Sequence, residues 1–203
     1  MARSVFGFLS KQATVEEISG PDHFFRLPRN SDYPQWYKLR SESRNFLEKW
    51  EPAWESDALT EGSFRSRVIR CNQEFASGVA QPLFLYSRQQ ETLLGGLTIG
   101  HIRRGASQSC MVGYWMGERH AGKGHMTAAI ELAVHHIFDR LNLHRIEAAC
   151  IPENERSIRL LEKAGFRREG YMHDYLKIRG EWRDHLLYAL VSNKHSKYGA
   201  SSI

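Results

Sequence analysis

The sequence predicts an α/β (α+β) fold built on one mixed, largely antiparallel sheet. Cys110 to Met116 is apolar apart from Gly113, as expected of a strand covered on both faces, and an amphipathic helix follows it. The strand from Arg145 to Ile151 is reached through that helix, which implies parallel pairing between the two strands. Hairpins turning at Arg88 to Glu91 and at Arg179-Gly180 make other pairs antiparallel.

The composition fits one globular domain. The chain has 203 residues, of which 41% are hydrophobic and 25% charged, enough for a sizeable core. Residues 1–21 are interpreted as an N-terminal extension, 22–191 as the domain and 192–203 as a polar tail. No apolar stretch approaches the roughly 20 residues of a membrane span, and no signal peptide is recognisable. We therefore expect a cytoplasmic protein with no membrane partner.

Cysteine usage and charge narrow the class further. Cys71, Cys110 and Cys150 are an odd number at wide spacing, which favours reduced, structural thiols. The net charge is +5 and the pI about 9.2, which favours approach to acidic surfaces such as ribosomal RNA. Lysine and arginine are scattered, however, so a merely solvated basic surface and real RNA affinity both remain open.

The first part of the chain supplies a strand, a helix and an aromatic segment. His23 to Leu27 is predicted to be a short strand, and Ser31-Asp32 caps the helix that follows. The segment from Asn45 to Asp57 is too aromatic for a plain linker, with Trp50 and Trp54. Its rings either wall a pocket or close one end of the core.

A second helix and a hairpin come next. Thr60 is the expected cap of a helix that runs to Phe75. Leu83 to Tyr86 and Thr92 to Ile102 are then predicted to be strands around a polar turn. Gly95-Gly96 and Gly100 weaken the second of these strands and mark bulges or bends.

The last part of the chain predicts a helix and a hairpin. Pro152 ends the preceding strand, and a helix runs from a cap at Asn154 or its neighbour to Ala164. Gly165 is a natural C-terminal stop. Arg167 to Ile178 and Trp182 to Leu190 are predicted to be the two strands of the final hairpin.

The turn after the central strand carries the chemical signal, and the helix after it lasts to about Leu141. Gly122 and Gly124 have no Cβ to block a ligand, and the first N–H groups of the helix lack intrahelical partners, so this is a potential anion site. It is not a nucleotide triphosphatase loop, because Gly124 stands where a magnesium-binding hydroxyl is needed. It is not a dinucleotide loop either, because Thr127 replaces the third glycine. What the turn does match is Arg119-x-x-Gly122-x-Gly124.

This pattern resembles the acetyl-coenzyme A pyrophosphate loop of the GNAT superfamily of N-acetyltransferases. Ile151 to Phe166 resembles the second superfamily motif at the expected separation. Similarity at Asn45 to Pro52, and from Glu169 to His185, narrows the resemblance to the ribosomal-protein alanine N-acetyltransferases. It covers roughly residues 22–191.

The resemblance implies a GNAT fold whose sheet is splayed at its centre, with helices on both faces and coenzyme A entering the split. Acetyl-CoA would be the acetyl donor, and no metal is needed; the ten histidines lack zinc-type spacing. The implied coenzyme-binding residues are Trp115, Met116, Arg119, Ala121, Gly122, Gly124, Met126, Thr127 and Asn154.

The catalytic groups are less uniform within the superfamily. Many members place a tyrosine, proposed to protonate the departing thiolate, where this chain has Leu161. Ser157 is similar to the serine proposed as acid or hydrogen-bond donor in the ribosomal-protein branch, and Asp174 lies near the proposed base. If the last hairpin has a two-residue turn, Asp174 faces His185 and Tyr175 faces Asp184.

The predicted activity is acetyl transfer to the N-terminal α-amine of a protein, a ribosomal protein by resemblance. Trp50, Glu51 and Tyr175 are the candidates for the acceptor wall. An α-amine is on the order of 10% neutral at pH 7 but a lysine only about 0.04%, so weak base help suffices for the former. A small amine, such as an antibiotic or polyamine, is the alternative acceptor, and a non-catalytic ribosome- or RNA-binding module is the alternative class. The sequence predicts no oligomeric state.

Overall fold

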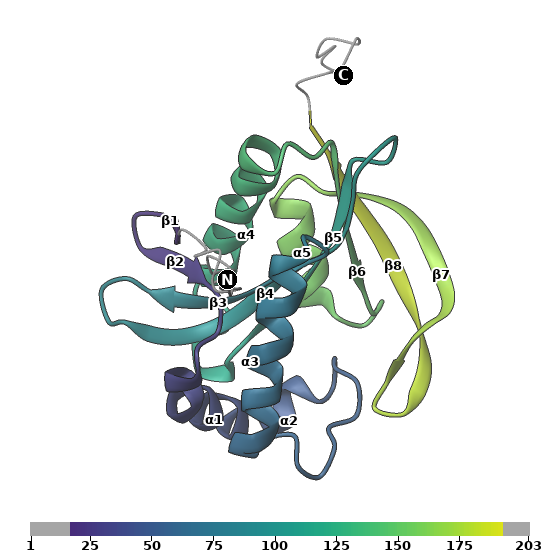
Figure 1. Ribbon diagram of the computed structural model, residues 1–203. Coiled ribbons are helices and arrows are strands. Elements are labelled where there is room, and N and C mark those ends of the chain that lie inside the picture. The colour runs from purple at the N-terminus through teal and green to yellow at the C-terminus, as the bar shows by residue number, and fades with distance from the viewer. Residues whose placement is uncertain (1–16, 193–203) are drawn as a thin grey trace, which may run out of the picture.

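Eight strands form one sheet in the order β1-β2-β3-β4-β5-β6-β8-β7 in the computed structural model, which describes residues 17–192 (Figure 1). Every neighbouring pair is antiparallel except β5 and β6. The strands are β1 (Ile18–Ser19), β2 (His23–Arg26), β3 (Gln81–Ser87), β4 (Thr92–Arg103), β5 (Ser109–Met116), β6 (Arg145–Cys150), β7 (Arg167–Ile178) and β8 (Glu181–Val191).

Five α-helices connect these strands. They are α1 (Tyr33–Glu42), α2 (Arg44–Leu47), α3 (Glu61–Ala76), α4 (His125–His135) and α5 (Glu155–Lys163). A π-helical turn, His136–Arg140, prolongs α4 to the predicted end of that helix. Within residues 17–192 no helix is long and apolar enough to cross a membrane.

The predicted caps are confirmed at α3 and α5. The Thr60 side chain accepts a hydrogen bond from the Ser63 amide at 3.2 Å, and Asn154 Oδ1 accepts one from the Ser157 amide, also at 3.2 Å. Both caps satisfy an amide that has no partner inside its helix. The predicted extension of residues 1–21 differs in one respect, because Ile18–Ser19 pairs with β2; residues 1–16 and the tail from 193 on lie outside the described residues.

The splay of the sheet lies between β5 and β6. These strands are parallel, and their ladder holds only three residue pairs, from Ser109 opposite Arg145 to Met111 opposite Glu147. Beyond it, Val112–Met116 and Ala148–Cys150 diverge, so two strand edges face each other without pairing. The expected splayed GNAT fold is therefore confirmed.

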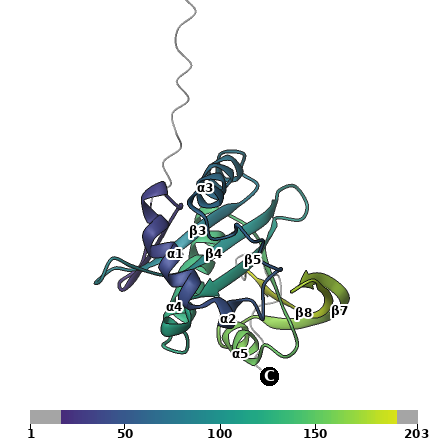
Figure 2. The same ribbon diagram turned by 90° about the horizontal axis from the view of Figure 1, so that it is seen from below.

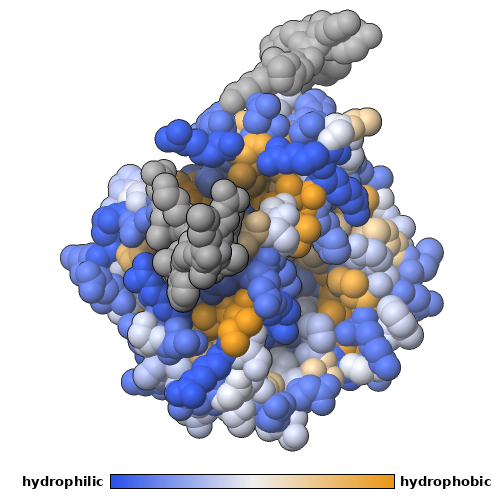
Figure 3. Space-filling view, viewed as in Figure 1, coloured by the Kyte–Doolittle hydropathy of each residue, from blue (hydrophilic) through white to orange (hydrophobic). Residues whose placement is uncertain are grey.

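Each face of the sheet is covered by its own helices. Helices α4 and α5 pack on one face, here called the α5 face, with Ile130, Leu161 and Tyr188 in the larger core cluster. Helices α1 and α3 pack on the other, here called the α3 face, with Trp36 and Phe64 in a smaller aromatic cluster. Figure 2 shows α3 on the side of the sheet opposite to α4 and α5. On the surface seen in Figure 3, hydrophobic residues form separate patches among hydrophilic ones.

The paired glycines of β4 make room for the indole of Trp115 on β5. A Cβ on Gly96 would lie 2.6 Å from Trp115 Nε1, and one on Gly95 would lie 2.3 Å from the Trp115 carbonyl oxygen. Both distances are too short for real contacts, so β4 can lie beneath Trp115 only with glycine at both positions. The predicted irregularities are also present, as the β3–β4 and β4–β5 ladders shift at Leu85/Tyr86 and Gly100/Arg103.

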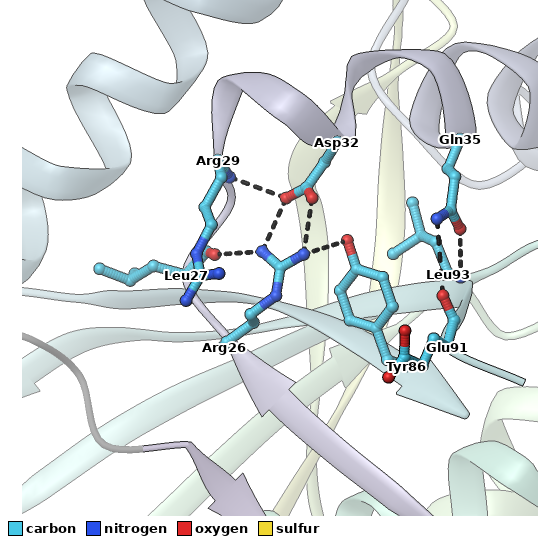
Figure 4. Close-up of polar contacts among 8 residues, drawn as sticks. All are labelled: Arg26, Leu27, Arg29, Asp32, Gln35, Tyr86, Glu91 and Leu93. Carbon is cyan, nitrogen blue, oxygen red and sulfur yellow. Dashed lines mark hydrogen bonds and ion pairs between the residues drawn. The ribbon is translucent and has the colours of Figure 1, made fainter. Parts of the chain in front are cut away.

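A buried ion pair ties the start of α1 to the sheet (Figure 4). Both oxygens of Asp32 accept hydrogen bonds from the Arg26 guanidinium, at 2.8 and 2.6 Å, and Arg26 also donates to Tyr86 Oη at 2.9 Å. Further along α1, Gln35 Oε1 accepts from the Leu93 amide of β4 at 2.9 Å. These contacts fix the helix that leads into the aromatic segment.

The last hairpin departs from the predicted register. Its turn is the expected two-residue Arg179-Gly180, with φ of 51° and 88°, and Leu176 lies opposite Arg183 as expected. A bulge then places residues 173–175 opposite a single residue, so that Met172, not Asp174, lies opposite His185. The predicted pairings of Asp174 with His185 and of Tyr175 with Asp184 are therefore wrong. The cause is the extra length of β7, in which Asp174 takes a left-handed φ of 46°.

Candidate active site

The turn into α4 presents an open, amide-lined surface. Gly124 is the N-cap residue with φ of 84°, and Gly122 has φ of 75°. The first i→i−4 bond of the helix runs from the Ala128 amide to the Gly124 carbonyl at 3.2 Å, so the amides of residues 125–127 precede it. Apart from the glycine itself and its two chain neighbours, no heavy atom of residues 17–192 lies within 4 Å of the place where a Cβ would sit on Gly122 or Gly124. The turn therefore fits a bound diphosphate, which needs donors, positive potential and close backbone approach.

The remaining residues of the turn are placed differently. Arg119 and Ala121 flank it, but the Ala121 amide is bonded to the Glu118 carbonyl at 3.1 Å. The Arg119 side chain is half-exposed and reaches Glu42 at 3.5 Å. Met126 is buried in the core, whereas Thr127 is half-buried in the first turn of α4. Only part of the predicted set therefore faces the open side of the turn through its amides.

Histidines surround the same turn. His23 Nε2 and His125 Nδ1 lie 2.8 Å apart, and the rings of His120 and His125 lie 6.3 Å apart, edge to face. Burial lowers the pKa of His23, and the neighbouring His125 lowers it further. Burial also lowers the pKa of His120, with Arg119 as the next cause. The rings of His23 and His120 therefore tend to be neutral unless an anion binds beside them.

A hydroxyl pair lies at the split on the α5 face. Tyr114 Oη of β5 and Ser157 Oγ of α5 are 2.5 Å apart, and the Asn154 side chain holds the Ser157 amide. Burial raises the pKa of Tyr114, and the Ser157 hydroxyl opposes the shift. Burial likewise raises the pKa of the neighbouring Cys150 thiol to about 11. Tyrosine and cysteine thus stay protonated near neutral pH, so Ser157 sits among neutral donors.

Sequence reasoning missed Tyr114. It is the only hydroxyl in the otherwise apolar stretch from Cys110 to Met116. A tyrosine hydroxyl inside a buried strand must find a hydrogen-bond partner, and this isolated polar group was the available signal. Met116, at the end of the strand, is buried in the core of the α5 face, whereas the Trp115 indole lies on the α3 face.

A charged and aromatic cluster lines the α3 face beside the split. Both Arg40 Nη atoms donate to the Glu51 carboxylate, at 2.7 and 2.6 Å, and Trp54 Nε1 donates to the same carboxylate at 2.8 Å. The Arg40 guanidinium lies between the rings of Trp54 and Trp115, 4.2 and 4.9 Å from their centres. The segment around Glu51 is thus held against β5 by an arginine that is 8% exposed.

The same segment lines a pocket of about 270 Å³. Its walls come from α1, α3 and the residues that follow Glu51, and include Trp36, Trp54 and Arg67. Burial, then the charge of Arg40, lowers the pKa of Arg67. Trp50 is half-buried at the end of the turn after α2, where its amide donates to Leu47 at 2.9 Å, and it does not line this pocket.

The final hairpin closes over the α3 face of the split. The Arg179 amide donates to the Glu51 carbonyl at 3.2 Å, which joins the hairpin turn to the aromatic segment. Tyr175 Oη lies 3.9 Å from Met111 Sδ of β5, and its ring meets that of His185 edge to face at 5.5 Å. The structure thus brings two of the predicted acceptor residues, Glu51 and Tyr175, to the same side of the sheet.

Asp174 lies at the outside of the hairpin. It is exposed, and its amide donates to Asp184 Oδ1 at 2.9 Å. This bond, followed by one from the Tyr171 hydroxyl, lowers the pKa of Asp184. The two predicted catalytic residues, Ser157 and Asp174, therefore have different surroundings: Ser157 is half-buried at the split, and Asp174 lies on an exposed bulge.

Nothing in residues 17–192 suggests a metal centre, since no group of three or more potential ligand side chains converges there. The chemistry available is that of an anion-binding turn, a strand split with free edges, neutral hydroxyl donors on one face and an aromatic cleft on the other. Such an arrangement suits transfer of a neutral acyl group from an anionic carrier.

Comparisons with known proteins agree with this reading. A family model described as acetyltransferase (GNAT) domain matches residues 23–167. The ribosomal protein uS5 alanine N-acetyltransferase of Escherichia coli K12 is 34% identical over 93% of this chain and 96% of its own. A Bacillus subtilis protein named "Probable N-acetyltransferase YjcK" is 36% identical over 86% of this chain and 97% of its own.

A solved structure shares the fold at similar identity. Mycobacterium smegmatis RimJ, in complex with CoA-disulfide, superposes with a TM-score of 0.80 at 34% identity, covering 86% of this chain and 84% of its own. Its fold therefore matches nearly the whole described chain.

Proposed function

The chain belongs to the GNAT acetyltransferase family, and we propose that it transfers the acetyl group of acetyl-CoA to the N-terminal α-amine of a protein, specifically of a ribosomal protein. The observation that carries this proposal is the junction of three features at one place: the open turn at Gly122 and Gly124, the unpaired edges of β5 and β6, and the hydroxyl pair beside them. The relatives named for ribosomal-protein acetylation support the acceptor class.

Donor binding is proposed at the split. Amides at Gly122, Gly124 and the first turn of α4, including Met126 and Thr127, would hold the diphosphate, with Arg119 and Ala121 at its border. The arm of the carrier would run between the free edges, past Trp115 and Met116, with the Asn154 side chain beside it. Acetyl-CoA supplies an activated thioester, and the residues of this chain hold and orient it.

Stabilisation of the leaving group is proposed on the α5 face. Ser157 would donate a hydrogen bond to the developing thiolate, while its oxygen accepts one from Tyr114. A donor that is already in place and shielded from water stabilises developing charge without reorganisation. This assigns to Ser157 the task that has been proposed for a tyrosine in many members of the superfamily.

The acceptor is proposed to enter from the α3 face, along Trp50, Glu51 and Tyr175. Asp174 is the base that the family resemblance suggests, and its exposed position on the bulge would suit proton acceptance through water. The modest help that an α-amine needs, compared with a lysine, makes such an indirect base adequate. A ribosomal-protein acceptor would also place the reaction in the cytoplasm, close to ribosomal RNA.

An acceptor panel tests this function. Initial rates are measured with acetyl-CoA and three acceptors: a ribosomal-protein N-terminal peptide, the same peptide with a blocked α-amine and a free lysine, and a polyamine. The proposal expects acetylation of the first alone. Activity on the polyamine with none on the peptide would overturn it. Salt-dependent RNA binding with no turnover would favour a non-catalytic module. Mass spectrometry of ribosomal proteins from cells with and without this chain would then identify the physiological acceptor.

A further inference from the structure

His185 lies on β8, where its ring packs against that of Tyr175. It is one residue beyond the ladder between β6 and β8, which ends with Cys150 opposite Leu186. Because Leu186 belongs to the core of the α5 face and strand residues alternate, His185 points to the α3 face. Its side chain is therefore on the opposite side of the sheet from Ser157, which would serve the leaving group. It is also next to Tyr175, one of the predicted acceptor residues.

The hydrogen bonds of His185 leave one nitrogen free to act. Nδ1 lies 2.9 Å from the Arg183 carbonyl oxygen, which can only accept, so Nδ1 carries the proton. Neutral His185 therefore has its lone pair on Nε2. Among residues 17–192 the one buried side-chain nitrogen or oxygen without a partner is Arg40 Nε, and no hydrogen bond is found for His185 Nε2. The residue is 3% exposed, so Nε2 can act only on an amine that binds directly beside the ring.

We propose that His185 Nε2, rather than the Asp174 carboxylate, takes the proton of the acceptor amine. The proposal rests on the proposed N-terminal acetyltransferase function. A base must come within hydrogen-bond reach of the proton it removes. The bulge in β7 swings Tyr175 inward against the His185 ring and leaves Asp174 exposed on the outer side. Geometry therefore favours the histidine.

The surroundings of His185 hold few other titrating groups. Tyr175 packs on the ring from β7, and Glu147 lies on the same side of β6, paired with Arg145 at 2.9 Å. On its own strand, Arg183 contacts Glu153 and Asp184 contacts Tyr171. The neighbouring carboxylates thus already have partners, which leaves the imidazole as the available base on this side of the α3 face.

Acetyl transfer begins with loss of a proton from the acceptor. The bound ammonium gives one proton to His185 Nε2, and the freed lone pair of nitrogen forms the C–N bond to the acetyl carbon. The C–S bond breaks, and its electron pair stays on sulfur. Nitrogen then loses a second proton, and the thiolate takes up one proton to become a thiol. One net proton leaves through His185 to solvent, and no oxidant or metal is needed.

The test compares His185→Gln with two variants of the same hairpin, Asp174→Asn and the exposed control His173→Gln. Rates with the N-terminal peptide are measured from pH 6 to pH 9. We expect His185→Gln to lower kcat/KM roughly 100-fold at pH 7, and the deficit to shrink toward pH 9, where the amine is already neutral. His173→Gln should match the wild type throughout. A deficit that does not change with pH would reduce His185 to a structural role.

Two further readouts separate failure of folding and failure of the function. Binding of CoA, measured by calorimetry, shows whether His185→Gln is folded. If it is not folded, the low-pH limb of the kcat profile is compared between the wild type and Asp174→Asn. An acid limb that persists in Asp174→Asn supports His185. Its loss in Asp174→Asn overturns the proposal. Wild-type protein that acetylates no peptide would instead reject the proposed function.

Discussion

Tyr114 Oη and Ser157 Oγ lie 2.5 Å apart and join the central strand β5 to helix α5 across the open part of the sheet. Because burial raises the pKa of Tyr114, its phenol remains a donor at neutral pH. When Tyr114 donates to Ser157 Oγ in this pair, the serine proton is free for a departing sulfur. The first prediction follows from this orientation.

Tyr114→Phe and Ser157→Ala should each lower kcat roughly 10- to 100-fold with little change in KM, because the donor they supply is needed only as the thiolate forms. The double variant should be no slower than Ser157→Ala alone, since the two hydroxyls act as one unit. Tyr37→Phe, which removes an exposed hydroxyl on α1, serves as the control. Steady-state rates of the single and double variants test this. If the two losses in activation free energy simply add in the double variant, the hydroxyls work independently.

Gly124→Ala should weaken CoA binding through the turn into α4. Gly124 has φ of 84°, and its added methyl group would enter the space left open for a ligand. Gly105→Ala is a matched control, because Gly105 also has positive φ and open space but lies in the β4–β5 loop. Both variants should lose about 1 kcal/mol of unfolding free energy. Calorimetry should find a loss of CoA affinity in Gly124→Ala only, and equal affinities would remove this turn from the donor site.

Glu51→Gln should destabilise the acceptor side of the protein. The change leaves the largely buried Arg40 guanidinium without its carboxylate partner, which costs about 3 kcal/mol. Glu48→Gln is the control, because its i,i+4 pair with Arg44 is surface-exposed and contributes less than about 0.5 kcal/mol. Urea unfolding measures both. Equal stabilities would mean that the rings of Trp54 and Trp115 hold Arg40 without Glu51.

Stability should fall as the pH is lowered from 7.5 to 5.5. Burial lowers the pKa of His136, and the charge of Arg140 lowers it further. Below the ordinary pKa of histidine the unfolded chain takes up a proton that folded His136 resists, so unfolding becomes easier. His136→Gln should show a smaller decrease than the wild type in urea titrations at the two pH values. His173→Gln, at an exposed position on β7, should lose as much stability as the wild type between the two pH values. A steeper decrease in His136→Gln would contradict the assignment.

The local structure was predictable where single residues decide it. Thr60 and Asn154 cap their helices, and Arg179-Gly180 forms the expected turn, because each element depends on neighbours in the sequence. The bulge in β7 was not predictable. It depends on the Asp184 carboxylate, which accepts from the Asp174 amide across the hairpin.

Long-range pairs were likewise invisible in the sequence. Tyr114 and Ser157 are 43 positions apart, and Arg40 meets Trp115 only because α1 packs on the α3 face. The motifs predict a donor site in the turn into α4, because Gly122 and Gly124 lie close together in the sequence. The residues proposed to act on the thiolate and the amine, Ser157 on α5 and His185 on β8, come from separate elements, and only the folded chain positions them.

The three-pair ladder between β5 and β6 makes this sheet a hinged structure. Strands β1 to β5 form one half of the sheet and β6 to β8 the other. A carrier bound between them would hold the two halves together. The amides of Val112–Met116 should then exchange hydrogen with solvent more slowly once the carrier is bound. Binding of the carrier would in this way reduce the mobility of β5. Donor binding and acceptor binding would then be coupled through the backbone.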